Sequence, residues 1–318
     1  MDYKDIVRVN KNVKEKLITK KDDLLVCARN GSARLIGKNA ILHETDANQT
    51  FGAFMMVFRS DKNHFVHQLL NTRRYSSQVS ENLGARINQI TSSDLSSFEF
   101  FFPKENNEMN KISALLDLFD ERIATQNKII DKLQSLIKGF RNDVFGKLRK
   151  NIGFNAVVGD VFDYEQPQSY IVEDTEYTNE GTPVLTANKA FVLGYTLETD
   201  GIYDKGDCII FDDFTLDCKY VDFPFKVKSS AIKILTAKNK ELLRYTFEFL
   251  KYLDLSTEEH KRHYIAETQN QEIILPTDQM VKTIAHIFST LSLRMETAVK
   301  QKNVFEKQKQ YLLRQMFI

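Results

Sequence analysis

Two stretches of the chain carry hydrophobic residues at alternating intervals of three and four, the spacing of a coiled-coil seam. In the first stretch the seam positions are Leu116, Ile123, Ile130, Leu133 and Ile137. An offset of 172 residues relates this stretch to a second one, whose apolar seam positions include Phe288, Leu291, Met295, Phe305 and Leu312. The pattern predicts long helices over residues 105–150 and 277–318 that pair through these side chains. At ~1.5 Å per residue, ~35 residues of such a helix span ~50 Å. Lys302 and Lys309 fall on the second seam, where a charge facing a partner helix can fix the register.

The segments that precede the two helices share an order of elements. Short strands leaving charged turns are predicted at residues 23–26 and 207–210, with further strands at 53–58 and 231–235. Helices are predicted at 64–75 and 241–253, and a last hydrophobic strand ending in a proline at 100–103 and 273–276. Each half of the chain therefore has the same order of elements: strands, a helix, a final strand, a proline and a long helix.

This internal repeat predicts an α+β protein with two mixed α/β domains, residues 1–104 and 151–276, each followed by a long helix. The first half has only 22 residues before its strand at Asp23. The second half, counted from residue 151, has about 55 residues before the corresponding strand at Asp207. We therefore expect the first domain to lack its opening strands. The alternative is a pair of unrelated surface helices, which the shared offset argues against.

The net charge of +1 hides an asymmetry between the two halves. Residues 1–150 hold 25 Lys and Arg against 18 Asp and Glu, whereas residues 151–318 hold 19 against 25. A basic half favours a polyanionic partner such as nucleic acid. The acidic side chains concentrate between residues 151 and 220, with 14 Asp and Glu against 3 Lys. We expect them to form a solvated surface or one that faces a protein partner.

Several features favour a cytoplasmic protein without a membrane anchor. The chain has no apolar run as long as the ~18–20 residues of a membrane helix, and its first 13 residues contain no signal-peptide pattern. Its three cysteines include no CxxC pair, which suits a reducing compartment and argues against structural zinc.

Residues 28–39 form the segment richest in candidate chemistry. They combine two glycines with Arg29, Asn30, Arg34 and Lys38 in a loop after a predicted strand. Glycine lets the backbone approach a phosphate closely, and arginine can contact guanine through two hydrogen bonds in the major groove. The spacing differs from a P-loop, because five residues separate the glycines and Asn39 follows the lysine. We interpret the loop as a DNA contact, with an ordinary basic hairpin as the alternative.

Further candidate DNA contacts lie in both halves. In the first half they are Arg73, Arg74 and Arg86, and in the second they are Lys189, Lys261, Arg262 and Tyr264. Residues 261–264 precede the final strand, as residues 84–89 do in the first half, and this equivalence supports the assignment. Solvated loops are the alternative for each cluster.

No pattern of catalytic or metal-binding residues is specific enough to predict an active site. The spacing of Asp212, Asp213 and Asp217 is not that of a calcium loop, and the pairs His64/His67 and His260/His263 lack the glutamate of a zinc-hydrolase helix. One nuclease-like match, around Asp254 and Glu259 to Lys261, is weak. We expect no metal, no cofactor and no catalysis by this chain. A coiled-coil scaffolding protein and a free-standing nuclease or methyltransferase remain competing hypotheses.

Longer runs of sequence resemble the specificity subunits of type I restriction–modification complexes. Residues 181–195, 209–215 and 219–230 are similar to one subclass of their target-recognition domains, and residues 21–38 and 89–103 are similar to another. The repeat of a globular segment and a long helix, which characterises that family, covers essentially the whole chain.

The resemblance implies a function and a set of partners. It implies that the two helices pack as an antiparallel coiled coil and that each recognition domain reads one half of a split target in double-stranded DNA. It further implies that the helices set the gap between half-sites and dock methyltransferase subunits. Those subunits, and not this chain, would bind S-adenosylmethionine, and restriction/translocase subunits could join them.

Overall fold

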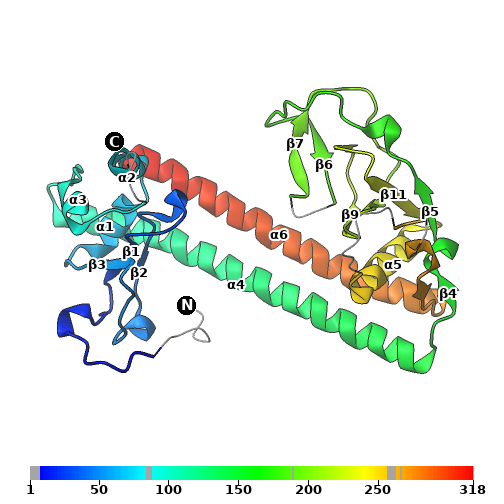
Figure 1. Ribbon diagram of the computed structural model, residues 1–318, viewed down its shortest axis with the longest axis horizontal. Coiled ribbons are helices and arrows are strands. Elements are labelled where there is room, and N and C mark those ends of the chain that lie inside the picture. Colours follow the sequence, from blue (N-terminus) through cyan, green and yellow to red (C-terminus); the bar gives the residue numbers. More distant parts are fainter. Residues whose placement is uncertain (1–7, 84–87, 188–189, 256–262, 266, 318) are drawn as a thin grey trace. The chain divides into compact units, whose positions relative to one another are not determined.

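The computed structural model describes residues 8–83, 88–187, 190–255, 263–265 and 267–317 (Figure 1). Two long helices dominate it, α4 over Asn106–Asn151 and α6 over Asp278–Met316. The chain divides into two compact units: unit 1 comprises Met1–Lys128 and Val299–Ile318, and unit 2 comprises Ile129–Ala298. Each long helix thus contributes one end to each unit. The α+β class predicted from the sequence is confirmed, and the long helices begin and end within two residues of the predicted bounds.

Unit 1 combines a small sheet with three short helices. Its α-helices and strands are β1 (Leu24–Cys27), β2 (Asn39–Ile41), β3 (Met55–Phe58), α1 (Asn63–Leu69), α2 (Arg73–Leu83) and α3 (Ser92–Ser97), with 3-10 turns at Glu15–Leu17, Ala33–Leu35 and Glu44–Asp46. The strands form an antiparallel sheet in the order β2-β1-β3. Leu24 and Val26 point from β1 into a core closed by Tyr75, Val79 and Ile90. Alternate residues of β1 are buried because successive side chains of a strand point to opposite faces.

Two sequence expectations for unit 1 are wrong. The helix predicted over residues 64–75 is broken into α1 and α2 at Thr72, whose hydroxyl oxygen accepts a hydrogen bond from the Tyr75 backbone N–H and so caps a new helix. The predicted final strand at Phe100–Phe102 is a segment without strand pairing in the described structure. Its aromatic side chains serve packing instead: the Phe100 ring lies 6.5 Å from Tyr75 and the Phe102 ring 5.4 Å from Phe65, centroid to centroid.

Unit 2 contains more strands, arranged in three sheets. Its strands are β4 (Ala156–Val157), β5 (Phe162–Glu165), β6 (Thr182–Leu185), β7 (Val192–Thr196), β8 (Cys208–Asp212), β9 (Cys218–Val221), β10 (Lys226–Val227), β11 (Ile232–Ala237) and β12 (Glu272–Ile273). Its helix α5 covers Lys240–Leu253, and 3-10 turns lie at Val158–Asp160, Gln168–Tyr170 and Thr268–Asn270. The sheets have the orders β5-β11-β8-β9, β10-β6-β7 and β12-β4.

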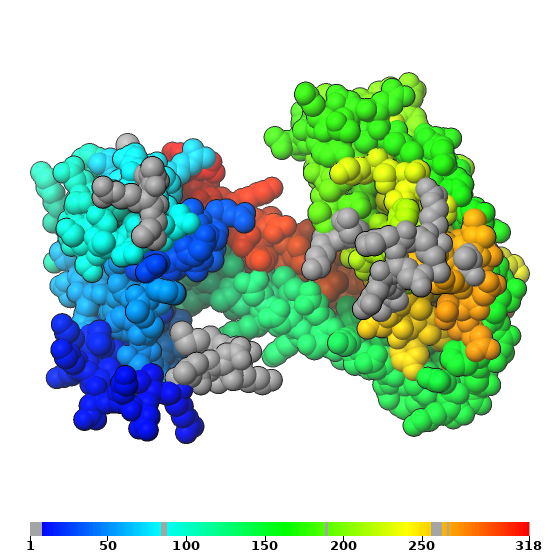
Figure 2. Space-filling view, in the orientation of Figure 1, coloured from blue at the N-terminus to red at the C-terminus, as the bar shows by residue number. Residues whose placement is uncertain are grey.

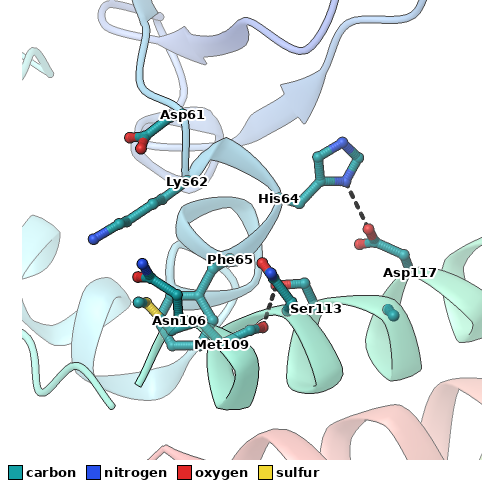
Figure 3. A pocket seen from close by; sticks show the side chains of 10 residues that line it. Asp61, Lys62, His64, Phe65, Asn106, Met109, Ser113 and Asp117 are labelled. Carbon is teal, nitrogen blue, oxygen red and sulfur yellow. Dashed lines mark hydrogen bonds and ion pairs between the residues drawn. The ribbon is translucent and has the colours of Figure 1, made fainter. Parts of the chain in front are cut away.

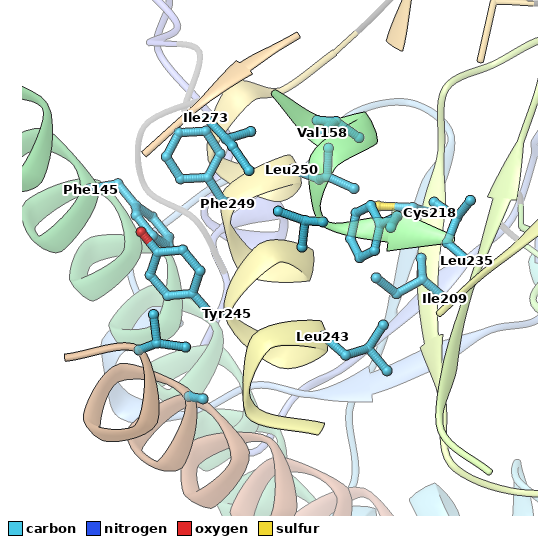
Figure 4. Close-up of a cluster of buried hydrophobic side chains, with 14 of the residues drawn as sticks. Phe145, Val158, Ile209, Cys218, Leu235, Leu243, Tyr245, Phe249, Leu250 and Ile273 are labelled. Atoms are coloured by element: carbon cyan, nitrogen blue, oxygen red, sulfur yellow. The ribbon is translucent and has the colours of Figure 1, made fainter. Parts of the chain in front are cut away.

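The core of unit 2 joins the sheet, α5 and both long helices. Helix α5 begins where Asn239 accepts a hydrogen bond from the Leu242 backbone N–H, and it packs apolar residues against β8, β9 and β11. Phe145 of α4 is fully buried beside Tyr245 and Phe249 of α5, with ring centroids 5.4 and 5.0 Å apart (Figure 4). Burying aromatic rings of this size contributes a large share of the hydrophobic free energy of a core.

The long helices run antiparallel in both units. In unit 1 the Phe119 and Phe305 rings lie 6.5 Å apart and Lys309 pairs with Asp120, and in unit 2 the rings of Phe140 and Phe288 lie 5.0 Å apart. The seam residues Leu116, Ile137 and Phe288 are buried. The other predicted seam residues are half-buried, namely Ile123, Ile130, Leu133, Leu291, Met295, Phe305 and Leu312.

The repeat explains why both units draw on both helices. Phe145 near the end of α4 and Phe317 after the end of α6 are related by the offset of 172 residues. Phe145 packs on α5 in unit 2, and the Phe317 ring lies 5.5 Å from Phe65 of α1 in unit 1. Each long helix therefore ends against the globular part of the other half of the sequence.

Candidate nucleic-acid interface

The β1–β2 loop presents the basic residues predicted from its sequence. The Cys27 backbone N–H donates to the Lys38 carbonyl, and the Gly37 N–H donates to the Cys27 carbonyl, so the loop closes as a hairpin. Arg34 and Lys38 are exposed, and the Arg29 guanidinium lies 5.2 Å from the Phe54 ring centroid. Asn30 is half-buried, and its side-chain oxygen accepts a hydrogen bond from the Ser32 backbone N–H, which fixes the turn.

A single glycine sets the shape of this hairpin. Gly37 has a φ of +78°, and a Cβ atom there would lie 2.8 Å from the Tyr75 hydroxyl oxygen. The Tyr75 hydroxyl donates a hydrogen bond to the Gly37 carbonyl at 2.8 Å. Burial raises the pKa of Tyr75, which keeps this donor protonated. The loop is thereby held against α2.

Helix α2 contributes two of the predicted arginines. Arg73, its first residue, is exposed. Arg74 is held in place, since its Nε donates to the Glu99 carbonyl at 2.8 Å and its guanidinium lies 4.8 Å from the Phe101 ring centroid. Arg86 lies outside the described residues.

The hairpin and α2 together enclose a cavity of about 560 Å³. It brings Arg34 and Lys38 of the segment 28–39 together with Arg73, which the sequence analysis assigned to a different cluster. Asn71, Ser76 and Ser80 from α2 and the turn before it, and Gln310 from α6, also line it. Figure 2 shows the C-terminal residues, in red, reaching the surface beside the residues of the first hundred positions, in blue and cyan. Sequence reasoning missed Gln310, because only the folded chain brings α6 next to this hairpin.

A second cavity of unit 1, about 400 Å³ between α1 and α4, has a different character (Figure 3). Its lining mixes Asp61, Lys62, His64 and Asp117, and His64 Nδ1 lies 2.6 Å from an Asp117 carboxylate oxygen. Acidic and basic side chains thus meet here within the protein. Among the described residues no group of three or more His, Cys, Asp or Glu side chains is placed to hold a metal ion.

In the second half the structure corrects the expectation for Tyr264. This side chain is 1% exposed, and its ring lies 5.4 Å from that of Tyr164 and 5.5 Å from that of Phe211. Its apolar ring fills the core between the sheet and the chain that leads to β12, so it has no surface with which to contact DNA. Lys189, Lys261 and Arg262 lie outside the described residues.

Two of the acidic residues expected at a solvated surface are buried instead. An Asp213 carboxylate oxygen accepts hydrogen bonds from the backbone N–H groups of His263 and Tyr264, at 3.1 and 2.8 Å, and Lys233 Nζ lies 3.4 Å from the other oxygen. Asp212 accepts from the backbone N–H groups of Phe214 and Thr215, at 2.9 Å each. Backbone donors and a lysine compensate the burial of these charges, so both carboxylates serve the fold.

Charged residues also join the long helices to each other in unit 1 and join α4 to α5 in unit 2. In unit 1 Lys309, a seam position, pairs with Asp120 of α4 at 2.5 Å. In unit 2 Glu248 of α5 accepts hydrogen bonds from Arg141 of α4 and from Arg244, at 2.6–3.0 Å. Such pairs favour one register of the helices, because a shift would leave charges buried without partners.

Comparisons with known proteins support one family. No protein-family model matches the chain. The chain is 45% identical over 136 residues, 40% of its length, to the specificity subunit of the type I restriction enzyme EcoR124I/EcoR124II of Escherichia coli. It is 27% identical over 150 residues, 46% of its length, to the EcoKI specificity subunit of Escherichia coli strain K12. These alignments span 34% and 32% of the relatives, so the chain matches about a third of the length of each.

The fold extends the likeness beyond the aligned residues. The crystal structure of the type I restriction–modification S subunit from M. genitalium superposes with a TM-score of 0.68, at 18% identity, over 94% of this chain and 84% of that one. At this identity the superposition shows a shared fold. None of the described helices is both long and apolar enough to span a membrane. The resemblance predicted from the sequence is therefore confirmed: the chain is similar to type I specificity subunits in sequence over part of its length and in fold over nearly all of it.

Proposed function

We propose that this chain is the DNA sequence-recognition subunit of a type I restriction–modification complex and has no active site of its own. The observation that carries the proposal is the combination of 45% identity to one specificity subunit with the S-subunit fold over 94% of the chain. The absence of catalytic motifs in the sequence agrees with it. In such a complex the chain would supply target recognition, and partner subunits would supply the chemistry.

The target is double-stranded DNA, read as two half-sites. We assign residues 1–104 and 151–276 as the two target-recognition domains and residues 105–150 and 277–318 as spacer helices. The basic hairpin of unit 1 supports a DNA contact, because Arg29, Arg34 and Lys38 are exposed. The second domain has an acidic balance, and partner subunits around it would supply part of the phosphate neutralisation.

The partners are methyltransferase subunits that bind S-adenosylmethionine and, in a complete complex, restriction/translocase subunits. We place the methyltransferase contact on the faces of the long helices that flank the seam. Large apolar side chains are exposed along both helices, including Leu118 (48%) and Leu136 (54%) of α4 and Leu293 (64%) and Tyr311 (59%) of α6. Exposed apolar groups that recur along a helix are typical of protein interfaces.

The test is to co-express the chain with a type I methyltransferase subunit and to map adenine methylation in the host DNA by single-molecule sequencing. The expected result is one split motif with a fixed gap. Arg34→Ala should weaken methylation without changing the motif, and Arg262→Ala should weaken or relax methylation through one half-site only. Lys111→Ala, a substitution at an exposed residue of α4, should leave the motif unchanged.

Each other outcome has a distinct meaning. A one-sided or palindromic motif would show that the first domain does not read DNA. A stable complex that methylates nothing would favour the scaffolding hypothesis. Loss of the whole complex on either arginine substitution would contradict the assignment of these residues to DNA contact.

A further inference from the structure

The cavity between the β1–β2 hairpin and α2 is distinguished by its charge. Its lining contains three cationic side chains, Arg34, Lys38 and Arg73, and no Asp or Glu. The cavity between α1 and α4 includes Asp61 and Asp117. A cavity of unit 2 beside Lys226 includes Glu173, Glu198 and Asp200. A cavity beside Phe101 also lacks acidic side chains but holds one cation, Arg74, so the first cavity is distinguished by the convergence of three.

The three cations are available to a ligand. All three are exposed, and among the described residues none of them forms an ion pair with an acidic side chain. Elsewhere in unit 1, cations such as Arg59 and Lys309 do pair with carboxylates. Like charges held close together repel one another, so their convergence favours an anionic ligand between them.

The frame around these cations is fixed by buried contacts. The Tyr75 hydroxyl holds the Gly37 carbonyl, and the Asn39 side-chain amide donates to the Leu70 carbonyl at 3.1 Å. The β2 end of the hairpin and the start of α2 are thus tied together at two points. A preformed recess of this kind binds with less loss of conformational entropy than a loop that must order on binding.

The recess suits a DNA backbone better than base edges. Base edges lie inside the grooves and are reached by a protruding helix or ribbon, whereas phosphates lie on the outer ridges of the duplex. A concave surface with cations on two walls can receive such a ridge. Gln310 of α6 places an uncharged amide at the same cavity, so α6 would not repel a phosphate there.

We propose that this cavity is a phosphate clamp, which holds backbone phosphates of duplex DNA and contributes affinity without reading sequence. The inference rests on the proposed function and assigns a separate role to Arg34, Lys38 and Arg73. The clamp positions the first recognition domain on the duplex, and other residues read the bases.

The test measures binding of the full-length chain to fluorescent 40-bp duplexes by anisotropy, at salt concentrations from 50 to 200 mM. One duplex carries the mapped methylation motif and the other an unrelated sequence. The variants are Arg34→Ala, Lys38→Ala and Arg73→Ala, singly and combined, and Gln310→Glu, which places a carboxylate at the cavity. Lys111→Ala and Gln308→Glu, exposed in the same unit but outside the cavity lining, are matched charge controls.

Each lost phosphate contact should reduce the slope of log K against log salt by about 0.9, which corresponds to about 8-fold weaker binding at 0.1 M salt. The triple variant should lose about 3 from the slope, Gln310→Glu should weaken binding, and both controls should match the wild type. The losses should be equal on the two duplexes.

Three results would overturn the clamp. A changed ratio of affinities for the two duplexes with an unchanged salt slope would show that these cations read bases. Unchanged binding by the triple variant would show that they do not touch DNA. If the wild-type chain bound neither duplex even in its complex with the methyltransferase subunit, both the clamp and the proposed function would fail.

Discussion

The buried charges around Glu248 make the folding of unit 2 sensitive to a single substitution. Glu248 has a side chain that is 2% exposed, and its carboxylate accepts hydrogen bonds from Arg141 at 3.0 and 2.6 Å and from Arg244 at 2.9 Å. Replacing Glu248 with Met keeps the volume but leaves two guanidinium groups without a counter-charge. Removing one partner of a buried ion pair costs about 3–5 kcal/mol. A domain is stable by only about 5–15 kcal/mol, so much of the stability of unit 2 should be lost.

Urea unfolding followed by circular dichroism measures this effect, supported by tyrosine fluorescence because the chain has no tryptophan. With a urea dependence of about 1–3 kcal/mol per molar, a loss of about 4 kcal/mol lowers the midpoint of the unit 2 transition by about 1.3–4 M. Asp143→Asn is the control, since Asp143 and Lys147 are 57% and 69% exposed and their pair should contribute under about 0.5 kcal/mol.

A compensating variant sharpens the test. Arg141→Met/Arg244→Met/Glu248→Met removes every charge of the cluster, and buried ion clusters replaced by apolar groups are often as stable as before. This triple variant should therefore recover most of the stability that Glu248→Met loses. The reasoning is refuted if Glu248→Met costs less than about 1 kcal/mol, or if the triple variant is less stable than the single one.

The remaining predictions concern packing and pH. Gly37→Ala should lower the melting temperature of unit 1 by several degrees, because Gly37 has a φ of +78° and an added Cβ has no room. Gly31→Ala, where a Cβ would lie in open space, should change the melting temperature little. Equal effects of the two substitutions would contradict the strain argument. Burial lowers the pKa of His67 from its ordinary value of 6.5, so the unfolded chain binds a proton at this residue more readily than the folded chain does. Unit 1 should therefore lose stability as the pH falls below 6.5. His67→Gln should abolish this part of the pH dependence in urea titrations. Phe145→Ala should cost about 3–5 kcal/mol in unit 2, and Phe317→Ala, which is only half-buried, about 2 kcal/mol in unit 1. Hydrogen exchange of the β8 and β1 amides measures the stability of unit 2 and of unit 1 separately. If Phe145→Ala destabilised unit 1 and Phe317→Ala destabilised unit 2, each long helix would instead end against the globular part of its own half of the sequence.

The long helices were predictable because their pattern is periodic and local. Hydrophobic residues that recur over several heptads define a seam whatever the rest of the fold does, and the ten predicted seam residues are buried or half-buried in the structure. The β1 and β8 strands followed from short apolar runs after charged turns. Their pairing order did not follow, since register depends on contacts between distant residues.

The errors came from residues whose role depends on tertiary contacts. Phe100–Phe102 has a strand-like composition, but its rings pack on Tyr75 and Phe65 while its backbone has no strand partner in the described structure. Tyr264 stands next to basic residues in the sequence, yet it is buried beside Phe211. A phenol ring is equally suited to a core and to a DNA surface, so composition alone could not decide.

The basic cavity could be predicted only in part, for a related reason. The sequence identified Arg34, Lys38 and Arg73 as candidates because of their charge. Their convergence depends on the close approach of Gly37 to α2, and Gln310 joins them only because α6 returns to unit 1. Proximity between residues so far apart in sequence has no local signal.

The exchange of helix ends between the halves has a consequence for a bipartite reader. Since α4 and α6 each take part in both units, neither globular part folds against its own helix alone. Ion pairs then restrict how the helices can slide. A slip of one turn, about 5.4 Å, would separate Lys309 from Asp120, now 2.5 Å apart, and would remove Arg141 from Glu248. Apolar seams tolerate such slips more readily than buried charges do, because a charge without a partner is costly in the interior. A subunit that reads two half-sites at a fixed gap requires this property, and under the proposed function the polar contacts along the helices supply it.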